Sequence, residues 1–323
     1  MTVDEEHYIF KKGLAAKLKA KDAKIQAWFT DRKSSITLPI YSSVDIRDSG
    51  HKIAPVDSNL YPAGFNNICP EDLRTSPKVF RDNLKGIRKL LIIPEFHTAN
   101  LYYLENLHYL KQILTEAGIE IRIGWNPETP LKEPLHLKSV TEKELLFENF
   151  TIENGRAVLG DFTPDMVLLN NDFSGGYPAV LDSITEQPVL PSHKMGWHTR
   201  KKSEHFRHYN RLITELSEIL DMDPWMFTIA STEVSPVNFE DGTGVEAVIT
   251  AAETIFKESE KKYAQYGMDQ KPFVFVKNNS GTYGMGIMVV HSIDELRTMN
   301  RRTKNKMSTG KNKSQISSGK FFM

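Results

Sequence analysis

The spacing of apolar positions changes along the chain, and these changes mark the expected elements. Apolar residues at helical spacing predict helices over residues 8–29, 100–117, 201–220 and 245–263. Short β-prone runs predict buried strands over residues 89–93, 119–123 and 165–170. The order strand, helix, strand between residues 89 and 123 is typical of a parallel sheet with a right-handed crossover. We therefore expect an α/β fold.

Turn and cap signals delimit further elements. Residues 153–155, Glu-Asn-Gly, predict a hairpin between strands at 145–150 and 157–159. The segment from Ser292 to Glu295 is typical of a capping box that begins a last helix. From residue 307 onward the chain is rich in Lys, Ser, Gly and Asn, so we expect this tail to be disordered.

A second predicted hairpin, over residues 273–290, joins two apolar strands through a glycine-rich loop. Lys277 ends the first strand. Three glycines then let the backbone turn and approach a ligand closely: Gly281, Gly284 and Gly286. Backbone N–H groups in such a loop, with a lysine beside them, suit phosphate oxygens. The pattern is neither a Walker A loop nor a Rossmann fingerprint, and a plain hairpin with a flexible tip is the alternative.

Composition and charge limit the class of protein. The 323 residues are 40% hydrophobic and 10% aromatic, as in a globular protein of about two domains. The formal net charge is zero, so bulk charge does not indicate nucleic acid or a membrane surface as a partner. Basic residues are nevertheless concentrated at the end, because residues 1–296 hold 33 Lys and Arg against 41 Asp and Glu.

The single cysteine and the apolar runs bear on location. Cys69 excludes an internal disulfide and fits a reducing compartment, and we expect a buried, unreactive thiol. The N-terminus is polar and acidic, unlike a signal peptide, and no apolar run is long enough to span a membrane. These features predict a cytoplasmic protein.

Polar residues gather at predicted strand ends and in loops, where open α/β sheets bind ligands. The first cluster comprises Arg47, Asp57, Asn59, Asn66 and Asn67. Its amides, together with an Asp and an Arg, suit the charged ends of an amino acid, and the segment that holds them is too polar for a strand. Asx turns that stabilise a buried loop are the alternative.

Two further clusters follow predicted strands. Residues 95–100 include His97, for which we expect a structural role, at the start of a helix that could attract an anion. Asn171 and Asp172 precede Gly175 and Gly176, a glycine pair that permits a ligand to approach the backbone. A plain turn is the alternative for this pair.

The fourth cluster combines three histidines with four cations between residues 193 and 205. The cations repel a metal ion, so the histidines do not predict a metal site. Arg200, Lys201 and Lys202 begin a helix, where positive charge opposes the macrodipole. This placement indicates a bound anion, with a solvated basic turn as the alternative.

Taken together, these segments resemble the bacterial ATP-grasp type of glutamate–cysteine ligase. The strand, lysine, glycine loop and second strand are similar to the hairpin that covers the phosphates in ATP-grasp ligases. The resemblance spans about residues 5–310 and rests on five ordered strings: Tyr41 to Arg47, Ala54 to Asn67, Asn170 to Gly176, Gly196 to Phe206 and Val276 to Gly286.

The resemblance implies a parallel-sheet substrate domain over residues 1–190, a partial ATP-grasp α+β domain over 191–306 and the tail over 307–323. It implies that L-glutamate, L-cysteine and ATP form γ-glutamylcysteine, ADP and phosphate through an acyl phosphate, with Mg²⁺. Lys277 and Arg200 are the expected catalytic residues. The expected ATP contacts add Ser280, Gly281, Gly284, Gly286, Lys201 and Lys202. The expected substrate contacts are Arg47, Asp57, Asn59, Asn66, Asn67, Asn171 and Asp172.

The chain departs from the family pattern in one respect. ATP-grasp enzymes carry their acidic metal ligands after the glycine-rich hairpin, but no acidic residue follows Glu295. We therefore expect an incomplete ligase whose metal ligands are unassigned; Asp172 and Glu204 are the first candidates if the ligands lie upstream. A non-catalytic amino-acid-binding protein and a carboxylate–amine ligase with other substrates are the alternatives.

Overall fold

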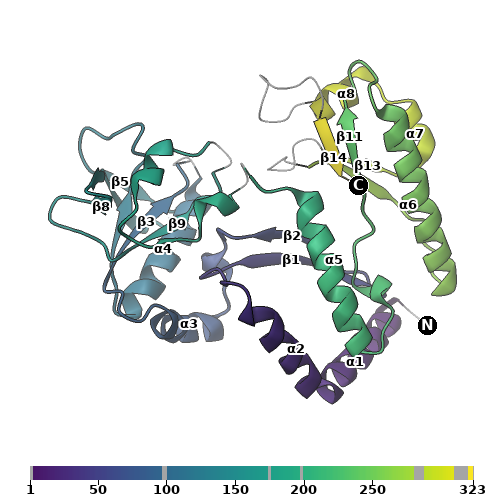
Figure 1. Ribbon diagram of the computed structural model, residues 1–323, viewed down its shortest axis with the longest axis horizontal. Helices are drawn as coiled ribbons and strands as arrows, with labels where there is room; N and C mark the ends of the chain where they lie inside the picture. The colour runs from purple at the N-terminus through teal and green to yellow at the C-terminus, as the bar shows by residue number, and fades with distance from the viewer. Residues whose placement is uncertain are drawn as a thin grey trace. The chain divides into compact units, whose positions relative to one another are not determined.

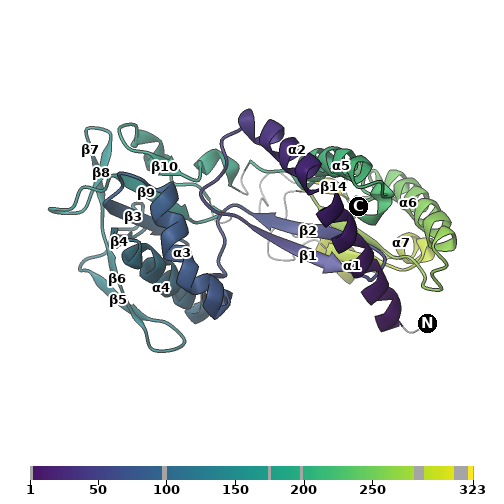
Figure 2. The same ribbon diagram turned by 90° about the horizontal axis from the view of Figure 1, so that it is seen from below.

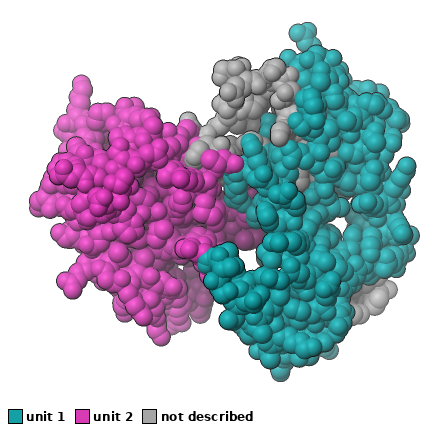
Figure 3. All heavy atoms as spheres, in the orientation of Figure 1, with its two compact units in different colours: residues 1–36, 45–56, 200–323 teal, residues 37–44, 57–199 magenta. Residues whose placement is uncertain are grey.

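A computed structural model describes residues 3–96, 100–173, 176–196, 199–279, 287–308 and 319–322 (Figure 1). The chain divides into two compact units, coloured separately in Figure 3. Unit 1 comprises residues 1–36, 45–56 and 200–323, and unit 2 comprises residues 37–44 and 57–199. The predicted division at residue 190 gave the N-terminal helices to the first domain, whereas here they belong to unit 1.

Unit 2 is built on a six-stranded sheet with the order β10-β9-β3-β4-β6-β5. Its strands are β3 (Lys89–Pro94), β4 (Glu120–Gly124), β5 (Leu135–Lys138), β6 (Glu144–Glu148), β9 (Met166–Asn170) and β10 (Val189–Leu190). β5 is antiparallel to β6, and all other neighbours are parallel. The predicted strand–helix–strand unit and its parallel sheet are therefore confirmed.

The central strands of this sheet are buried on both faces, as near-continuous apolar runs require. α4 (Leu101–Glu116) packs on one face, where Leu107 and Leu110 join Leu90 and Ile92 in one core cluster (Figure 2). Alternate residues of the same strands pack on the other face against three phenylalanines: Phe150, Phe162 and Phe173. Asn100 caps α4 by accepting hydrogen bonds from the N–H groups of its first turn.

α3 (Pro70–Asn83) also packs in this core, through Phe80, but the apolar spacing did not predict it. Proline stands at its first position and again at Pro77, and proline within a pattern normally argues against a helix. Cys69 directly precedes α3 and is exposed, so the predicted buried thiol is wrong. Its thiol lies 3.2 Å from a carboxylate oxygen of Asp72 and can donate to it.

The predicted hairpin around residue 154 is present with shifted strands. β7 (Thr151–Glu153) pairs with β8 (Arg156–Val158), and Asn154 and Gly155 both take positive φ between them. Two such residues form the turn that best matches strand twist. A strand is present near the expected residues 145–150, but it is β6 of the main sheet, so its expected pairing in this hairpin is wrong. Short 3₁₀ helices complete unit 2: Phe65–Asn67, Ala179–Ser183 and His193–Met195.

Unit 1 contains a four-stranded sheet with the order β11-β14-β12-β13. The strands are β11 (Glu233–Val237), β12 (Val274–Asn278), β13 (Ile287–Val290) and β14 (Gly319–Phe322), and every neighbouring pair is antiparallel. One face packs on α6 (Val245–Gln265), whose buried residues meet Val274, Val276 and Val290. The two strands predicted to flank the glycine-rich loop are confirmed.

Two short helices follow this hairpin, α7 (Ile293–Arg297) and α8 (Arg301–Ser308). The predicted capping box is incomplete, because Ser292 makes no side-chain cap bond. Glu295 instead accepts from the N–H of His291 at 3.0 Å. Disorder was expected from residue 307, but residues 319–322 lie in β14; the segment 309–318 lies outside the described residues.

Three helices form a separate layer of unit 1: α1 (Val3–Ala20), α2 (Asp22–Ser34) and α5 (Lys202–Ile219). The single helix predicted over residues 8–29 is divided at Lys21, whose φ of −106° and ψ of 9° are not helical. α2 lies beside α5, and Trp28 Nε1 donates to Glu215 at 3.0 Å (Figures 1 and 2). A 3₁₀ turn, Pro224–Met226, follows α5.

β1 (Ser43–Asp48) and β2 (Ile53–Asn59) pair as a two-stranded ribbon whose strands both contain residues of each unit. The segment from residue 55 was judged too polar for a strand, so β2 corrects that expectation. A two-stranded ribbon has only edge strands, which tolerate Pro55 and polar side chains. No helix among the described residues is long and apolar enough to cross a membrane.

Candidate functional site

Strand register places Lys277 on the face of the unit 1 sheet that α6 does not cover. Val274 and Val276 point into the core, so Phe275 and Lys277, which alternate with them, point the other way. Phe275 is 42% exposed, and the Lys277 ammonium lies 5.1 Å from the centre of its ring. Four further predicted ATP contacts lie outside the described residues: Ser280, Gly281, Gly284 and Gly286.

Asn279, directly after β12, is bonded to the start of α5. Its Oδ1 accepts from the Ser203 N–H at 2.9 Å, and its Nδ2 donates to Ser203 Oγ at 2.8 Å. Its carbonyl oxygen accepts from the Lys202 N–H at 3.2 Å, and only 1% of the residue is exposed. These contacts bring together two clusters that were predicted separately, the glycine-rich hairpin and the basic turn.

The basic turn cannot bind an anion mainly through the first N–H groups of α5, because Asn279 already accepts from two of them. The side chains of Arg200, Lys201 and Lys202 are therefore the groups that could meet phosphate. Arg200 Nη2 lies 3.4 Å from His205 Nδ1, and Lys201 holds the N-cap position without a side-chain cap bond. The expected anion site thus depends on side-chain charge.

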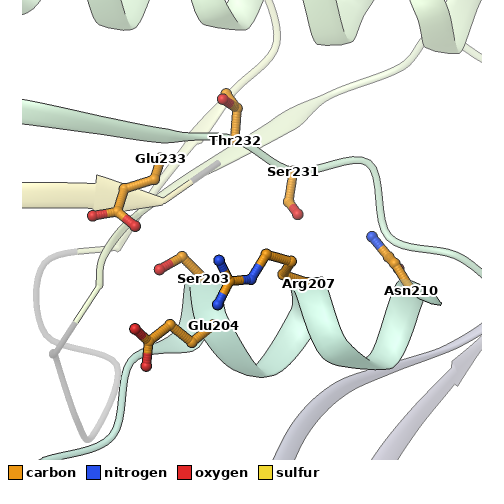
Figure 4. A pocket seen from close by; sticks show the side chains of 7 residues that line it. All are labelled: Ser203, Glu204, Arg207, Asn210, Ser231, Thr232 and Glu233. Carbon is orange, nitrogen blue, oxygen red and sulfur yellow. The ribbon is translucent and has the colours of Figure 1, made fainter. Parts of the chain in front are cut away.

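A cavity of about 450 Å³ opens beside this contact (Figure 4). Four lining residues come from α5: Ser203, Glu204, Arg207 and Asn210. Three come from the segment that enters β11: Ser231, Thr232 and Glu233. Figure 4 shows the Arg207 guanidinium extended along the helix toward Ser203, with the two carboxylates at the same end of the cavity.

Local structure explains why these side chains share the cavity. Residues 203, 207 and 210 are spaced four and three apart, so they lie on one face of α5. Asn210 holds the opposite wall, because Nδ2 donates to the Ile229 carbonyl at 2.7 Å and Oδ1 accepts from the Ile229 N–H at 2.8 Å. Ser203 Oγ is fixed by Asn279. Hydrogen bonds to Ile229 and Asn279 therefore fix two of the residues that line the cavity.

Glu233 also relates the cavity to Lys277. Both residues pair directly with residue 322 of β14, one from each side. Directly paired residues of antiparallel strands project from the same face, so Glu233 and Lys277 project from the same face. They are two strand spacings apart, roughly 9–10 Å.

A buried polar network lies at the carboxyl ends of β3 and β9 in unit 2. Asn170 donates to the Pro62 carbonyl at 2.8 Å and accepts from Asn106 at 3.2 Å. Tyr103 donates to the Asn170 carbonyl at 2.7 Å, and Tyr41 donates to the Leu169 carbonyl. Burial raises the pKa of Tyr103 well above its ordinary value. This network attaches the loop around Pro62 to the end of β9.

Asn171 and Asp172, two predicted substrate contacts, follow this network. The Asn171 side chain donates to the Pro94 carbonyl at 2.9 Å and accepts from the Phe173 N–H at 2.7 Å. The Asp172 N–H donates to Glu95 at 2.7 Å. The structure therefore joins the second and third predicted clusters, although His97 and Gly175 lie outside the described residues and Asn171 serves mainly to hold the turn.

The members of the first predicted cluster are divided between the two units. Arg47 belongs to unit 1 and is exposed on β1, whereas its expected partners belong to unit 2. Asn59 accepts from the Tyr61 N–H at 2.8 Å, which is the Asx turn given as the alternative. Asp57 accepts from the Ser58 N–H at 3.0 Å, and the amide of Asn66 donates to Asn67 at 3.3 Å.

The comparisons with known proteins bear on this arrangement. The model of the glutamate–cysteine ligase (GshA) family matches residues 15–319. This chain belongs to that family. A crystal structure from Methylobacillus flagellatus KT, assigned as a gamma-glutamylcysteine synthetase, is similar with 37% sequence identity and a TM-score of 0.86. The match covers 95% of this chain and 72% of that chain, and a comparison with curated proteins gives no match.

For a member of the glutamate–cysteine ligase family, a divalent metal is an expected partner of ATP. No three His, Cys, Asp or Glu side chains gather into a possible metal site within the ranges that the structure describes. The two upstream candidates, Asp172 and Glu204, belong to different units.

Unit 1 holds a second set of interacting charges, around Lys52. Its ammonium donates to the Trp225 carbonyl and lies 4.7 Å from the centre of the Trp225 ring. Burial lowers the pKa of Lys52 to about 8, while nearby Asp223 acts to raise it and Lys262 to lower it further. Lys262 and Asp223 form an ion pair at 2.5 Å. This set packs the end of α6 against the turn after α5.

Sequence reasoning missed the residues that define the cavity: Arg207, Asn210, Ser231, Thr232 and Glu233. A signal for some of them was present, because Ser203, Arg207 and Asn210 form a polar stripe at helical spacing. From the sequence, this polar stripe could not be distinguished from the solvated face of an amphipathic helix. Asn279 was missed because its partner lies 76 residues away in the chain.

Proposed function

We propose that this protein joins the γ-carboxylate of L-glutamate to the amine of L-cysteine, with conversion of ATP to ADP and phosphate. Its membership of the glutamate–cysteine ligase family supports this reaction. The structural observation that carries the proposal is the Asn279–Ser203 contact. It holds the Lys277 strand beside the basic turn, which supports one triphosphate site shared by positive side chains from the two segments.

The chemistry has two steps, and both develop negative charge on phosphoryl oxygens. A γ-carboxylate oxygen of glutamate attacks the γ-phosphorus of ATP, and ADP leaves. The amine of cysteine then attacks the carbonyl carbon of the acyl phosphate, phosphate leaves, and the amine proton passes to a base or to water. In phosphoryl transfer the protein mainly aligns the reactants and stabilises charge.

Lys277 and Arg200 are the proposed catalytic residues, because their charges neutralise the transferred phosphoryl group. Lys201, Lys202, Ser280 and the amides of the glycine-rich loop would hold the rest of the triphosphate, in the manner of ATP-grasp ligases. We assign no step to a metal ion. Mg²⁺ would reach the site bound to ATP.

Glutamate contacts are proposed on each unit by itself. Arg47 is the proposed contact on unit 1, and the proposed contacts on unit 2 are Asp57, Asn59, Asn66, Asn67, Asn171 and Asp172. The exposed carboxylate of Asp57 and guanidinium of Arg47 supply the charges that an amino acid requires. The thiol product fits the reducing compartment that the single cysteine indicates.

The test is a ligation assay on the purified chain with Mg-ATP, L-glutamate and L-cysteine. We expect γ-glutamylcysteine by mass spectrometry and one ADP for each product molecule. ADP release should require both amino acids together. Product formation with another amine but not with cysteine would indicate a different carboxylate–amine ligase, and amino-acid binding without ADP release would indicate a non-catalytic binding protein.

A further inference from the structure

The cavity beside α5 carries charges of both signs. Arg207 supplies one positive charge, and Glu204 and Glu233 supply two negative charges. The remaining lining residues that the structure describes carry hydroxyls and one amide. A cavity of about 450 Å³ lies in the range of small-molecule sites.

These charges favour a ligand that carries one negative and one positive group. A phosphate chain would meet two carboxylates, and a simple cation would meet the guanidinium. A ligand with one carboxylate and one ammonium satisfies both kinds of group, because a guanidinium pairs with a carboxylate through two parallel hydrogen bonds. A second carboxylate on the ligand would add repulsion, since two carboxylates stand against one guanidinium among the lining residues that the structure describes.

We infer that this cavity binds a neutral α-amino acid, with its carboxylate on Arg207 and its ammonium between Glu204 and Glu233. On the proposed function, on which this assignment rests, the ligand is the amine substrate and not glutamate. Its position supports this role, because Glu233 projects from the same sheet face as Lys277. An ammonium held by Glu233 therefore lies on the side of the sheet where the acyl phosphate forms.

The direct test is calorimetric titration of the full chain with L-2-aminobutyrate, which replaces the cysteine thiol with a methyl group. Butyrate lacks the ammonium and n-butylamine lacks the carboxylate, so each should bind at least tenfold more weakly. Arg207→Ala should weaken 2-aminobutyrate binding at least tenfold, and Glu204→Gln or Glu233→Gln several-fold. Titrations are run with and without a non-hydrolysable ATP analogue, and wild-type protein that binds 2-aminobutyrate in neither condition overturns the inference.

Matched controls lie on the same helix outside the cavity. Arg211→Ala and Glu218→Gln remove the same charges from exposed positions of α5, so they should leave affinity unchanged. Arg207→Lys keeps the charge but loses the paired hydrogen bonds, so its affinity should fall between those of wild type and Arg207→Ala. Equal affinity of wild type and Arg207→Ala would overturn the inference.

Ligation assays on the same variants separate this inference from the proposed function. If wild type makes no γ-glutamylcysteine but Arg207→Ala still abolishes 2-aminobutyrate binding, the proposed ligation reaction is wrong and the assignment of the cavity to an amino acid is retained. If wild type makes product and Arg207→Ala leaves the KM for cysteine unchanged, the reaction stands and the cavity assignment is wrong.

Discussion

Asn279 caps a helix to which it does not belong. Its Oδ1 accepts from the Ser203 N–H at 2.9 Å, and its Nδ2 donates to Ser203 Oγ at 2.8 Å. Helices usually satisfy their first N–H groups with their own N-cap side chain, but Lys201 makes no such bond. The residue that precedes the glycine-rich loop therefore also fixes the basic turn and one wall of the cavity.

Asn279→Ala should lower the free energy of unfolding by about 1–3 kcal/mol, because it leaves buried polar groups without partners. Ser203→Ala should cost less, about 0.5–1.5 kcal/mol, since the backbone N–H of residue 203 keeps its acceptor. Urea denaturation of both variants measures the difference. Wild-type stability in Asn279→Ala would mean that the contact contributes nothing to holding the two segments together.

Lys277→Ala should slow ATP-dependent ligation. The loss of one cation at the phosphates removes about 2–4 kcal/mol of transition-state stabilisation. The fold should be retained, since Lys277 lies on the uncovered face of the sheet and not in its core. Steady-state rates of ADP release measure the effect, with the exposed Lys271→Ala as a matched control. Near-normal turnover would remove Lys277 from the mechanism.

Arg47→Ala and Asp57→Asn should weaken glutamate binding without unfolding the protein. Both side chains are exposed, and asparagine at position 57 keeps the oxygen that accepts from the Ser58 N–H. Calorimetric titration with L-glutamate measures the affinity, and Asp45→Asn on the same ribbon is the control. Unchanged affinity in both variants would show that these residues serve only the local structure.

Lys52 predicts a pH dependence of stability. Burial lowers its pKa in the folded state to about 8, below the ordinary value of 10.5. Between these values the unfolded chain binds more protons than the folded chain, so this residue makes stability rise with pH. Below about pH 8 both states are protonated, and the full cost of burying the charge is present.

Lys52→Met should therefore remove a stability increase between about pH 8 and pH 10. Urea denaturation of wild type and variant at pH 7.5, 8.5 and 9.5, roughly spanning that window, gives the difference directly. The exposed Lys257→Met controls for the loss of a positive charge elsewhere. If the difference in the free energy of unfolding between wild type and Lys52→Met stays constant with pH, the lysine is not desolvated.

Elements whose pattern is local could be predicted from the sequence. The strands at β3, β4 and β9 and the helices α4, α5 and α6 each have their apolar spacing within one segment, and tertiary packing agrees with it. α3 was hidden by Pro70 and Pro77, and β2 by its polar residues. β14 lies in the tail whose composition predicted disorder, and it pairs with β11 and β12.

The candidate site also combines segments that could be predicted from local sequence with contacts that form only in the folded chain. Lys277 and the basic turn were predicted from local motifs, but their proximity depends on Asn279 and could not be read from either segment. The cavity is formed by one face of α5 and by the segment that enters β11, which follows α5 after the 3₁₀ turn Pro224–Met226. Arg207 and Glu233 acquire a shared role only through this packing.

The discontinuity of unit 1 has a consequence for synthesis of the protein. Lys17 of α1 donates to the Leu220 carbonyl at the end of α5, 203 residues later in the chain. At roughly 5–20 residues per second, a ribosome needs about 10–40 s to deliver that partner. Unit 2 is translated almost entirely within this interval and can fold first. The N-terminal helices must wait without their partner, so a chaperone that covers such unpaired helices should increase the yield of native protein.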